Sequence, residues 1–319
     1  MKKLYVFLMI LVTFTTLSCK KGSDKVVEKV FFSMDTAVVL SVEEKDFKKT
    51  DKVVEYVSKL EEEIVNDQKN INNSNLNQAI KVTDTFIEVF NRAIKYSEIS
   101  EYIYDPTSIT VAKLYGFPSG KFQVPDNSSL INAKKEAGKK NIVLKNNEIY
   151  RKTFANIDLS ANAKGYIVDK TVEYMKKKGF KNFIVNAGGD LYTYGKKYSE
   201  SPYKIAIEDP DNDKGFISII KLSNKAVATS GNYERFFIAK DGRRITHFFN
   251  GINFESVNNY KSISVISDSV EMADGLATMY YLLKVEDINK ICTKYKTPVL
   301  IATLDNKHLK MCGWEEFEE

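Results

Sequence analysis

The sequence has 319 residues, of which 43% are hydrophobic and 28% are charged, an ordinary globular composition that allows a sizeable core. The formal net charge is +5, but the lysines are spread along the chain and form no basic stripe interleaved with aromatic residues, which excludes a typical nucleic-acid-binding pattern. The chain also has no fixed-period repeat and no low-complexity block, so a solenoid is excluded as well.

The N-terminal segment has the pattern of an export signal. Residues 1–18 start with two lysines, continue with an apolar run that is too short for a comfortable membrane span, and end in small residues before Cys19. The segment resembles a bacterial lipoprotein signal peptide. This implies cleavage before Cys19, lipidation of its thiol, a tether over 19–25 and a membrane-anchored protein on the extracytoplasmic side of the cell envelope. The alternative is an ordinary secretory peptide with an incidental cysteine.

Two cysteines remain in the mature chain, Cys292 and Cys312. They could pair in an oxidising compartment, but the sequence does not show that the fold brings them close enough. We expect both to be unpaired and mostly buried, because free cysteine commonly packs as a small apolar residue.

The first half of the mature chain predicts both strands and helices. Residues 26–42 predict two strands with a polar break at 33–36, since β-branched and aromatic residues flank that break. Apolar residues on one helical face predict a helix over 51–66, an asparagine-rich turn, and a second helix from about Thr83 to the residues before Pro106. Residues 139–153 predict a hairpin closed by two asparagines.

The second half continues in the same style, with turn residues between short apolar segments. In chain order it predicts a helix over 162–178 that ends at Gly179, a short strand before Gly188, strands over 203–210, 216–222 and 225–230, a hairpin over 235–249, a strand over 260–267, helices after Ser269 and over 285–295, and a terminal hairpin around 305–307. We therefore predict one compact α+β domain over 26–319 with mixed, largely antiparallel sheets and packed helices, because long antiparallel pairings argue against a doubly wound parallel sheet.

Two glycine-containing segments are the first candidates for ligand contact. One is AKG at 163–165 before a helix, and the other is the turn at 188–190. Glycine lets a backbone approach a ligand closely, and amides in such turns suit anionic oxygens, so we expect a phosphate cradle here. Taken alone, such glycines are more often packing or turn devices, and the chain has neither a Rossmann nor a P-loop motif.

A second candidate lies on the helix after Ser269. Asp274 and Thr278 are four residues apart, so their side chains leave one helix face, and a carboxylate with a hydroxyl suits Mg²⁺. The alternative is a carboxylate near a helix start and a threonine that faces the core.

Histidine is scarce, with only His247 and His308 in the chain. His247 ends a strand beside Arg243 and Arg244, so it could serve acid–base or phosphate chemistry, or it could be a satisfied, half-buried side chain. His308 lies in a polar turn and is expected at the surface. The absence of H-E-x-x-H and C-x-x-C patterns argues against a zinc enzyme.

Five separated pieces of the chain resemble, in order, the motifs of the FAD:protein FMN transferase family, the ApbE-type flavin transferases. The pieces are MDT at 34–36, DPT at 105–107 with LYGF at 114–117, DLSANAKGYIVD at 158–169, NAGGD at 186–190 with TSGNYERFF at 229–237, and MADGLAT at 272–278. The resemblance covers nearly all of the mature chain. It implies a magnesium-dependent envelope enzyme that binds FAD and transfers FMN to a threonine hydroxyl of an acceptor protein with a D-G-x-T-x-A-T motif, releasing AMP.

The resemblance also implies roles for individual residues. Asp274 and Thr278 match the metal ligands, together with a backbone carbonyl that we assign to Ala163, and His247 matches the candidate base for the attacking threonine. The remaining matches are expected to contact FAD, and they are Met34, Asp105, Lys164, Gly165, Tyr166 and Ser230.

The chain departs from the family pattern mainly after His247. The family's D-P-x-T-G is replaced by residues 250–254, NGINF, the first histidine of its pair is Thr246, and the glycine of M-G-T is Asp35. These changes concern acceptor docking or turnover more than FAD binding. Three functions therefore stay open, which are FMN transfer, FAD pyrophosphatase activity giving FMN and AMP, and flavin binding without catalysis.

Overall fold

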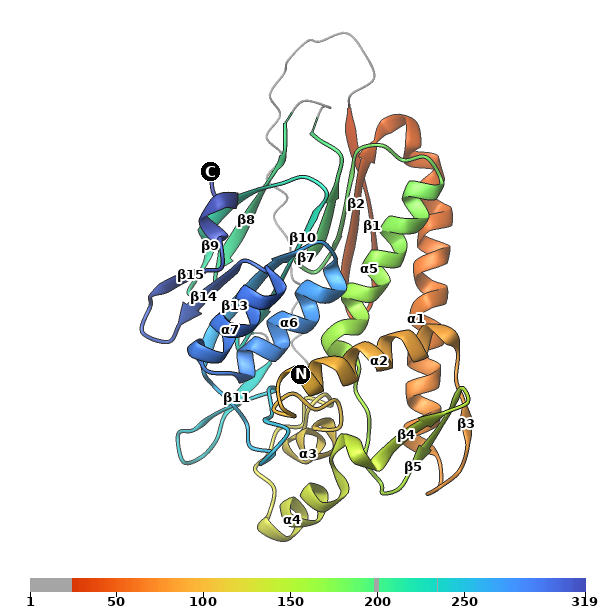
Figure 1. Cartoon of the computed structure of the whole chain (residues 1–319), viewed down its shortest axis with the longest axis vertical. Coiled ribbons are helices and arrows are strands. Elements are labelled where there is room, and N and C mark those ends of the chain that lie inside the picture. Colours follow the sequence, from red (N-terminus) through yellow and green to blue (C-terminus); the bar gives the residue numbers. More distant parts are fainter. Residues whose placement is uncertain (1–24, 198–200, 234) are drawn as a thin grey trace, which may run out of the picture.

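The computed structural model describes residues 25–197, 201–233 and 235–319 (Figure 1). The predicted signal peptide, Cys19 and almost all of the predicted tether lie outside the described residues. Within the part of the chain that is described, no helix has both the length and the apolar character needed to cross a bilayer.

The central element is a sheet of eight strands in which every neighbouring pair is antiparallel. Its strands, in spatial order, are β1 (Val26–Ser33), β2 (Thr36–Glu43), β6 (Phe183–Ala187), β7 (Asp190–Tyr194), β10 (Lys225–Gly231), β13 (Tyr260–Ser267), β14 (Val299–Thr303) and β15 (His308–Met311). The predicted α+β class with antiparallel pairing is confirmed.

Helices cover one face of this sheet (Figure 1). They are α1 (Thr50–Asn73), α2 (Asp84–Ile99), α5 (Ser160–Lys177), α6 (Val270–Leu282) and α7 (Val285–Tyr295). Val53 of α1 and Val168 of α5 pack with Leu40 of β2 in one buried cluster. The opposite face is covered by the hairpin of β8 (Tyr203–Asp209) and β9 (Asn212–Leu222) and by the buried Trp314.

The remaining elements form a smaller lobe at the lower end of Figure 1. They are the sheet of β3 (Ile80–Lys81), β4 (Ile142–Lys145) and β5 (Glu148–Arg151), the helices α3 (Ile109–Ala112) and α4 (Asn127–Glu136), and the hairpin of β11 (Phe236–Ile238) and β12 (Arg244–Thr246). Helix α4 is absent from the sequence-based prediction, because it has no buried residue and so little apolar periodicity to reveal it.

The two predicted hairpin turns at 33–36 and 146–147 are confirmed. Met34 and Asp35 have φ values of 55° and 57°, and Asn146 and Asn147 have values of 51° and 60°. Two successive left-handed residues are what a tight two-residue hairpin requires, since this backbone matches the twist of the paired strands. Met34 is therefore held at the tip of a rigid turn.

Two predicted boundaries are wrong, and both errors concern the site. Helix α1 runs on into the asparagine-rich segment and ends at Asn73, because Asn72 bonds the backbone of Ile157 with both ends of its amide, at 2.7 and 2.9 Å. Helix α5 begins at Ser160 and not at about Asn162, so AKG lies inside its first turns.

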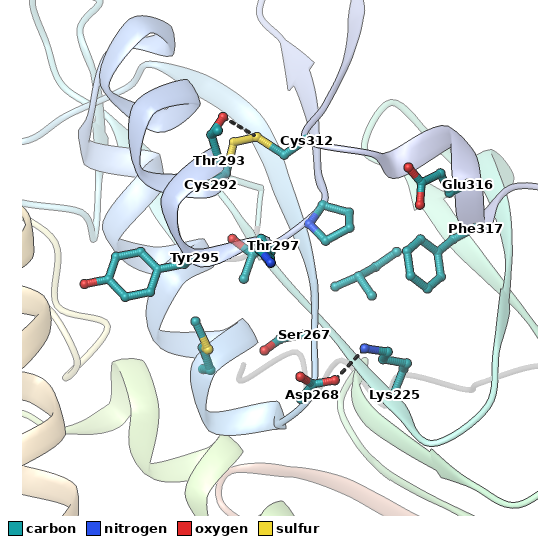
Figure 2. A pocket seen from close by; sticks show the side chains of 14 residues that line it. Lys225, Ser267, Asp268, Cys292, Thr293, Tyr295, Thr297, Cys312, Glu316 and Phe317 are labelled. Carbon is teal, nitrogen blue, oxygen red and sulfur yellow. Dashed lines mark hydrogen bonds and ion pairs between the residues drawn. A yellow bond between two sulfur atoms is a disulfide. The ribbon is translucent and has the colours of Figure 1, made fainter.

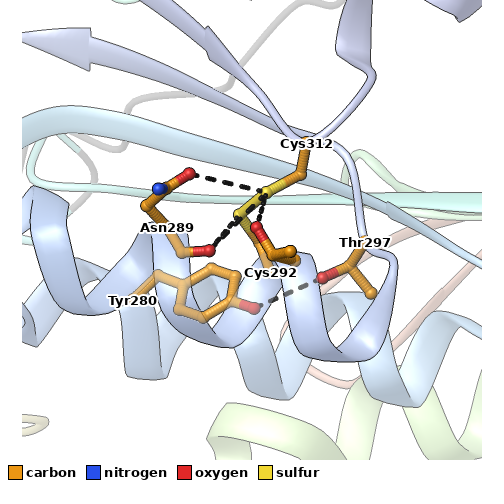
Figure 3. The surroundings of a disulfide bond; sticks show 6 residues. Tyr280, Asn289, Cys292, Thr297 and Cys312 are labelled. Atoms are coloured by element: carbon orange, nitrogen blue, oxygen red, sulfur yellow. Dashed lines mark hydrogen bonds between the residues drawn. A yellow bond between two sulfur atoms is a disulfide. The ribbon is translucent and has the colours of Figure 1, made fainter.

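The prediction of two unpaired cysteines is also wrong, because Cys292 and Cys312 form a disulfide with a Cα–Cα distance of 6.0 Å (Figure 3). Cys292 lies on the buried face of α7, and Cys312 follows the edge strand β15. Sequence spacing alone could not show that α7 packs beside this strand end. The disulfide borders a cavity of about 450 Å³, as does the ion pair of Lys225 and Asp268 (Figure 2).

Reducing this disulfide is expected to lower the free energy of unfolding by about 3 kcal/mol, because the bond closes a loop with a sequence separation of 20. Urea unfolding with and without dithiothreitol measures the difference. A Cys292→Ala, Cys312→Ala variant serves as the control, since its unfolding should not respond to the reductant. Equal unfolding curves for the wild-type protein in both conditions would contradict the bond.

Candidate active site

A cavity of about 640 Å³ lies where the helical layer meets the smaller lobe. Its wall is built from the tip of the β1–β2 hairpin, α1, the segment after α2, the first turns of α5, the end of β10, the segment after β12, and α6. Eight of the residues predicted for metal, FAD or base chemistry line it, and they are Met34, Asp105, Ala163, Lys164, Ser230, His247, Asp274 and Thr278.

Oxygen donors gather on one side of the cavity. Asp274 and Thr278 leave α6 one turn apart, and the Thr278 hydroxyl lies 3.0 Å from the hydroxyl of Ser230 at the end of β10. Burial raises the pKa of Asp274 well above its ordinary value, and the charge of nearby Asp190 adds to this shift. Because a bound cation would stabilise the ionised carboxylate, this group is suited to hold one.

Helices α5 and α6 cross at Gly165, and each is bonded to the other by a carboxylate. The Gly165 N–H donates to Asp274 Oδ2 at 2.9 Å. In the other direction, the N–H groups of Val270 and Glu271 in the first turn of α6 donate to Asp169 of α5 at 2.8 and 3.0 Å. The crossing therefore fixes the Asp274 carboxylate against the first turns of α5, where Ala163 and Lys164 lie.

A Gly165→Ala substitution is expected to separate the two helices. The added Cβ would lie 2.6 Å from the Val270 carbonyl oxygen and 2.7 Å from the Glu271 Cα, which are backbone atoms that cannot turn aside. We expect a loss of about 1–3 kcal/mol in unfolding free energy, as for overpacked cores, together with weaker divalent-cation binding. Thermal melts with and without Mn²⁺ measure both effects. Lys177→Ala at the exposed end of α5 is the control, and an unchanged Gly165→Ala variant would contradict the close crossing.

A buried polar cluster around Glu271 links the crossing of α5 and α6 to α2. Glu271 is 1% exposed and accepts hydrogen bonds from Arg92 at 2.8 Å and from the Tyr96 hydroxyl at 3.0 Å, both on α2. Asn162, in the first turn of α5, donates to the same carboxylate at 3.3 Å. The cluster thus joins α2, α5 and α6 beneath the oxygen donors.

His247 lies in the cavity wall between aromatic rings. Its ring centroid is 4.0 Å from that of Phe248 and 6.5 Å from that of Phe117. Its Nδ1 lies 3.1 Å from the carbonyl oxygen of Arg235, and a carbonyl only accepts, so Nδ1 carries the hydrogen and Nε2 can accept a proton. Burial lowers the pKa of His247 to about 4, which keeps the ring neutral at physiological pH.

Met34 is held at the cavity by a carboxylate of α1. Its N–H donates to Glu61 Oε1 at 2.8 Å, and the neighbouring Ser33 hydroxyl bonds the other oxygen of Glu61. The left-handed turn therefore presents Met34 in one orientation, and Glu61 itself lines the cavity.

Asp105 uses both carboxylate oxygens to shape its own loop. Oδ1 accepts the N–H and the hydroxyl of Thr107, at 2.8 and 2.6 Å, and Oδ2 accepts the N–H of Lys139 at 2.9 Å. Gly251 packs directly against this loop, since a Cβ there would lie 2.6 Å from Asp105 Cβ. Asp105 therefore lines the cavity as a residue that organises the wall.

Gly165 and Tyr166, which were also expected to contact FAD, do not line the cavity. Gly165 is buried in the helix crossing and contributes its N–H to Asp274. Tyr166 is 3% exposed, does not line the cavity and donates its hydroxyl to Glu88 of α2 at 2.9 Å. Consecutive positions on a helix point in different directions, so the motif AKGY cannot place all its side chains in one cavity.

A family model described as the ApbE family matches residues 34–301 of this chain. The chain belongs to the ApbE family. This match begins at the hairpin tip that carries Met34 and ends in β14, so it includes every element that lines the cavity.

Relatives named FAD:protein FMN transferase are similar to most of the chain. The protein from Vibrio cholerae is 28% identical over 242 residues, covering 74% of this chain and 72% of the relative. The protein from Haemophilus influenzae is 28% identical over 246 residues, covering 73% and 70%.

Solved ApbE structures share the fold. The ApbE protein from Thermotoga maritima has a TM-score of 0.84 at 24% identity and covers 92% of this chain and all of that one. The structure titled flavin transferase ApbE from Vibrio cholerae has a TM-score of 0.80 at 24% identity, covering 92% and 99%.

Several residues around this ApbE cavity escape sequence reasoning. Asp190 lies 2.7 Å from Lys164, with which it forms an ion pair. It is the last residue of the NAGGD motif, so the preceding glycine turn could have indicated that it lies near the site. Glu61, Gln68 and Asn72 recur on one face of α1 at helical spacing, which is a pattern typical of an exposed polar face. In the fold, Met34 contacts Glu61, and the segment 157–159 contacts Gln68 and Asn72. Among the described residues, no group of three or more His, Cys, Asp or Glu side chains is arranged so that it could hold a metal ion.

Proposed function

We propose that this ApbE-family protein transfers FMN from FAD to a threonine hydroxyl of an acceptor protein, in a Mg²⁺-dependent reaction that releases AMP. The observation that carries the proposal is the convergence of eight separately predicted residues on one cavity, with oxygen donors and a neutral histidine in its wall. The names of the relatives from two organisms support the same activity.

The charges of the cavity favour a bound divalent cation. Five carboxylate residues line it, Asp35, Glu61, Asp105, Asp158 and Asp274, against three cationic ones, Lys113, Lys164 and Arg235. A divalent cation between these carboxylates and a pyrophosphate would reduce the repulsion between them. The Asp274 carboxylate, the Thr278 hydroxyl and the Ala163 carbonyl are hard oxygen donors of the kind that Mg²⁺ prefers.

The chemistry then divides among the residues of the chain. Mg²⁺, when bound, would neutralise charge on the phosphate oxygens. The acceptor hydroxyl oxygen forms a bond to the flavin-side phosphorus, the bond from that phosphorus to the bridging oxygen breaks, and AMP leaves. His247 accepts the hydroxyl proton at Nε2, since its Nδ1 is bonded to the Arg235 carbonyl.

The altered loop after His247 is compatible with this proposal, because it is well formed. The Asn250 side chain accepts the N–H of Ile252 at 2.8 Å, and its carbonyl accepts the N–H of Phe254 at 2.7 Å. The N–H of Gly251 donates to the Ile103 carbonyl at 2.7 Å. Asn250 therefore closes the loop as an aspartate would, and Gly251 provides the close approach to the wall of the cavity.

We further propose that the protein acts as a lipoprotein outside the cytoplasm, anchored through Cys19. The disulfide between Cys292 and Cys312 supports this location, because such bonds persist in oxidising compartments and are rare in the cytosol. Metabolic labelling with a palmitate analogue, compared with a Cys19→Ser variant, tests the anchor. Equal labelling of both proteins would contradict it.

The reaction is tested by incubating the mature protein with FAD and Mg²⁺, with and without an acceptor fragment that carries the D-G-x-T-x-A-T motif, and separating the products by chromatography. We expect AMP to form only with the acceptor and Mg²⁺. Formation of AMP and free FMN without an acceptor would show that the protein is an FAD pyrophosphatase and not a transferase. Unchanged FAD in every mixture would identify a flavin-binding protein without catalysis and overturn the proposal.

A further inference from the structure

Asp190 is a buried carboxylate that lies directly behind the cavity wall. It begins β7, its side chain is 2% exposed, and its Oδ2 lies 2.7 Å from the Nζ of Lys164. Its Oδ1 accepts the N–H of Thr229 at 3.2 Å. One carboxylate is therefore in contact with two residues that line the cavity, although it does not line the cavity itself.

These two contacts come from different sides of the site. Lys164 belongs to the first turns of α5, next to the Ala163 carbonyl, whereas Thr229 lies on β10 next to Ser230. The Thr229 hydroxyl is fixed in turn by the Ser264 hydroxyl at 2.7 Å, and Ser230 pairs with Thr278. Of these two contacts, only the ion pair with Lys164 depends on the charge of Asp190, because the Thr229 N–H needs only an acceptor oxygen.

The ammonium of Lys164 is the counter-charge of the buried Asp190 carboxylate. A buried carboxylate without a counter-charge is strongly unfavourable, and the ion pair with Lys164 offsets that cost. The Lys164 side chain is 28% exposed and lines the cavity, so the ion pair holds it at the cavity wall. A free lysine would have to lose more rotamer freedom before it could contact a ligand.

We propose that Asp190 is a positioning residue that holds the Lys164 ammonium against the cavity wall, where it contacts phosphate oxygens of the bound dinucleotide. This inference rests on the proposed function, since it takes FAD as the ligand. Asp190 acts through Lys164 and touches neither the ligand nor the reacting atoms. Its effect on FAD binding should therefore disappear when Lys164 is absent.

A double-mutant cycle tests the inference, with Asp190→Asn, Lys164→Met and the double variant. Asparagine keeps the size of the side chain and an oxygen for the Thr229 N–H, but it loses the charge that holds Lys164. We expect each single variant to bind FAD about tenfold or more weakly in the presence of Mg²⁺, as for a lost charge-assisted contact. The double variant should bind FAD no more weakly than Lys164→Met.

The thermal stability of the same variants provides a readout that needs no ligand. Lys164→Met leaves a buried carboxylate without its counter-charge, so its melting temperature should fall, and adding Asp190→Asn should restore part of that loss. Lys170→Met is the matched control, because Lys170 lies on the same helix and pairs with Glu88 at 3.0 Å outside the cavity. It should leave FAD affinity unchanged.

The inference would be overturned if the losses of FAD affinity caused by the two single substitutions multiplied in the double variant. It would also be overturned if the Asp190→Asn variant bound FAD as tightly as the wild-type protein does. Riboflavin, which has no phosphate, should bind equally to all variants, and a loss of riboflavin binding in parallel with FAD would also overturn it. A wild-type protein that does not bind FAD would instead overturn the proposed function, and this inference with it.

Discussion

Replacing Asp274 with alanine is expected to abolish Mg²⁺-dependent product formation from FAD. The carboxylate is the only charged group among the three proposed metal donors, and removing it leaves a hydroxyl and a carbonyl that are too weak to hold the cation. Activity measured as AMP release over a range of Mg²⁺ concentrations checks this result. Binding of Mn²⁺ followed by electron paramagnetic resonance gives a second readout that does not depend on turnover.

Two further variants make this result specific. Asp274→Asn keeps an acceptor for the Gly165 N–H, so it should lose the cation while it keeps the helix crossing. Its melting temperature should not fall, because the buried position already disfavours the ionised carboxylate. Asp287→Ala on the exposed face of α7 should behave like the wild-type protein. Full Mn²⁺ binding by Asp274→Ala would show that Asp274 is not a metal ligand.

Replacing His247 with alanine is expected to slow FMN transfer by about 10²-fold or more, as is typical when a general base is removed. The defect should appear in the transfer rate and not in FAD affinity, since His247 is proposed to take the proton of the acceptor hydroxyl. His308→Ala is the matched control, because His308 is exposed on the terminal hairpin. A normal transfer rate in His247→Ala would show that His247 is not the general base.

The pH dependence of the wild-type rate tests the same role. Burial lowers the pKa of His247 from its ordinary value of 6.5 to about 4, so the ring becomes protonated only when the pH falls through about 4. The base form is present above that value, and the transfer rate should show no loss with a midpoint near 6.5. A drop centred near 6.5 that disappears in His247→Ala would contradict the environment described for this ring.

Local sequence patterns predicted the secondary structure well where they carry their own chemistry. The polar break at 33–36 between apolar segments predicted the turn in which Met34 and Asp35 take left-handed conformations, and Ser269 caps α6 by accepting the N–H of Met272 at 3.3 Å. Helix α7 was predicted with its observed bounds, Val285–Tyr295, because its apolar face repeats at helical spacing. Each of these features depends on residues close together in the sequence.

Features that depend on distant contacts were missed or misplaced. Asn72 continues α1 because it bonds Ile157, which is 85 residues away in the sequence. Cys292 and Cys312 pair because α7 lies beside the end of β15, and Tyr166 turns away from the cavity because its hydroxyl meets Glu88 on α2. Such contacts arise from tertiary packing, which no local pattern of residue types records.

The same distinction applies to the site. The family resemblance brought forward Asp274, Thr278 and His247, which line one cavity, but it gave no role to Asp190, Glu61 or Glu271. These carboxylates hold Lys164, Met34 and Asn162, so they act through other residues of the wall and its support. Their supporting role can be assigned only from the structure, which shows the residues that they contact.

FMN transfer is tested by the intact mass of an acceptor fragment after incubation with the mature protein, FAD and Mg²⁺. We predict one covalent FMN, located by peptide mapping on the threonine of the D-G-x-T-x-A-T motif and absent when that threonine is alanine or Mg²⁺ is chelated. An acceptor that keeps its unmodified mass while FAD is bound or cleaved would contradict it.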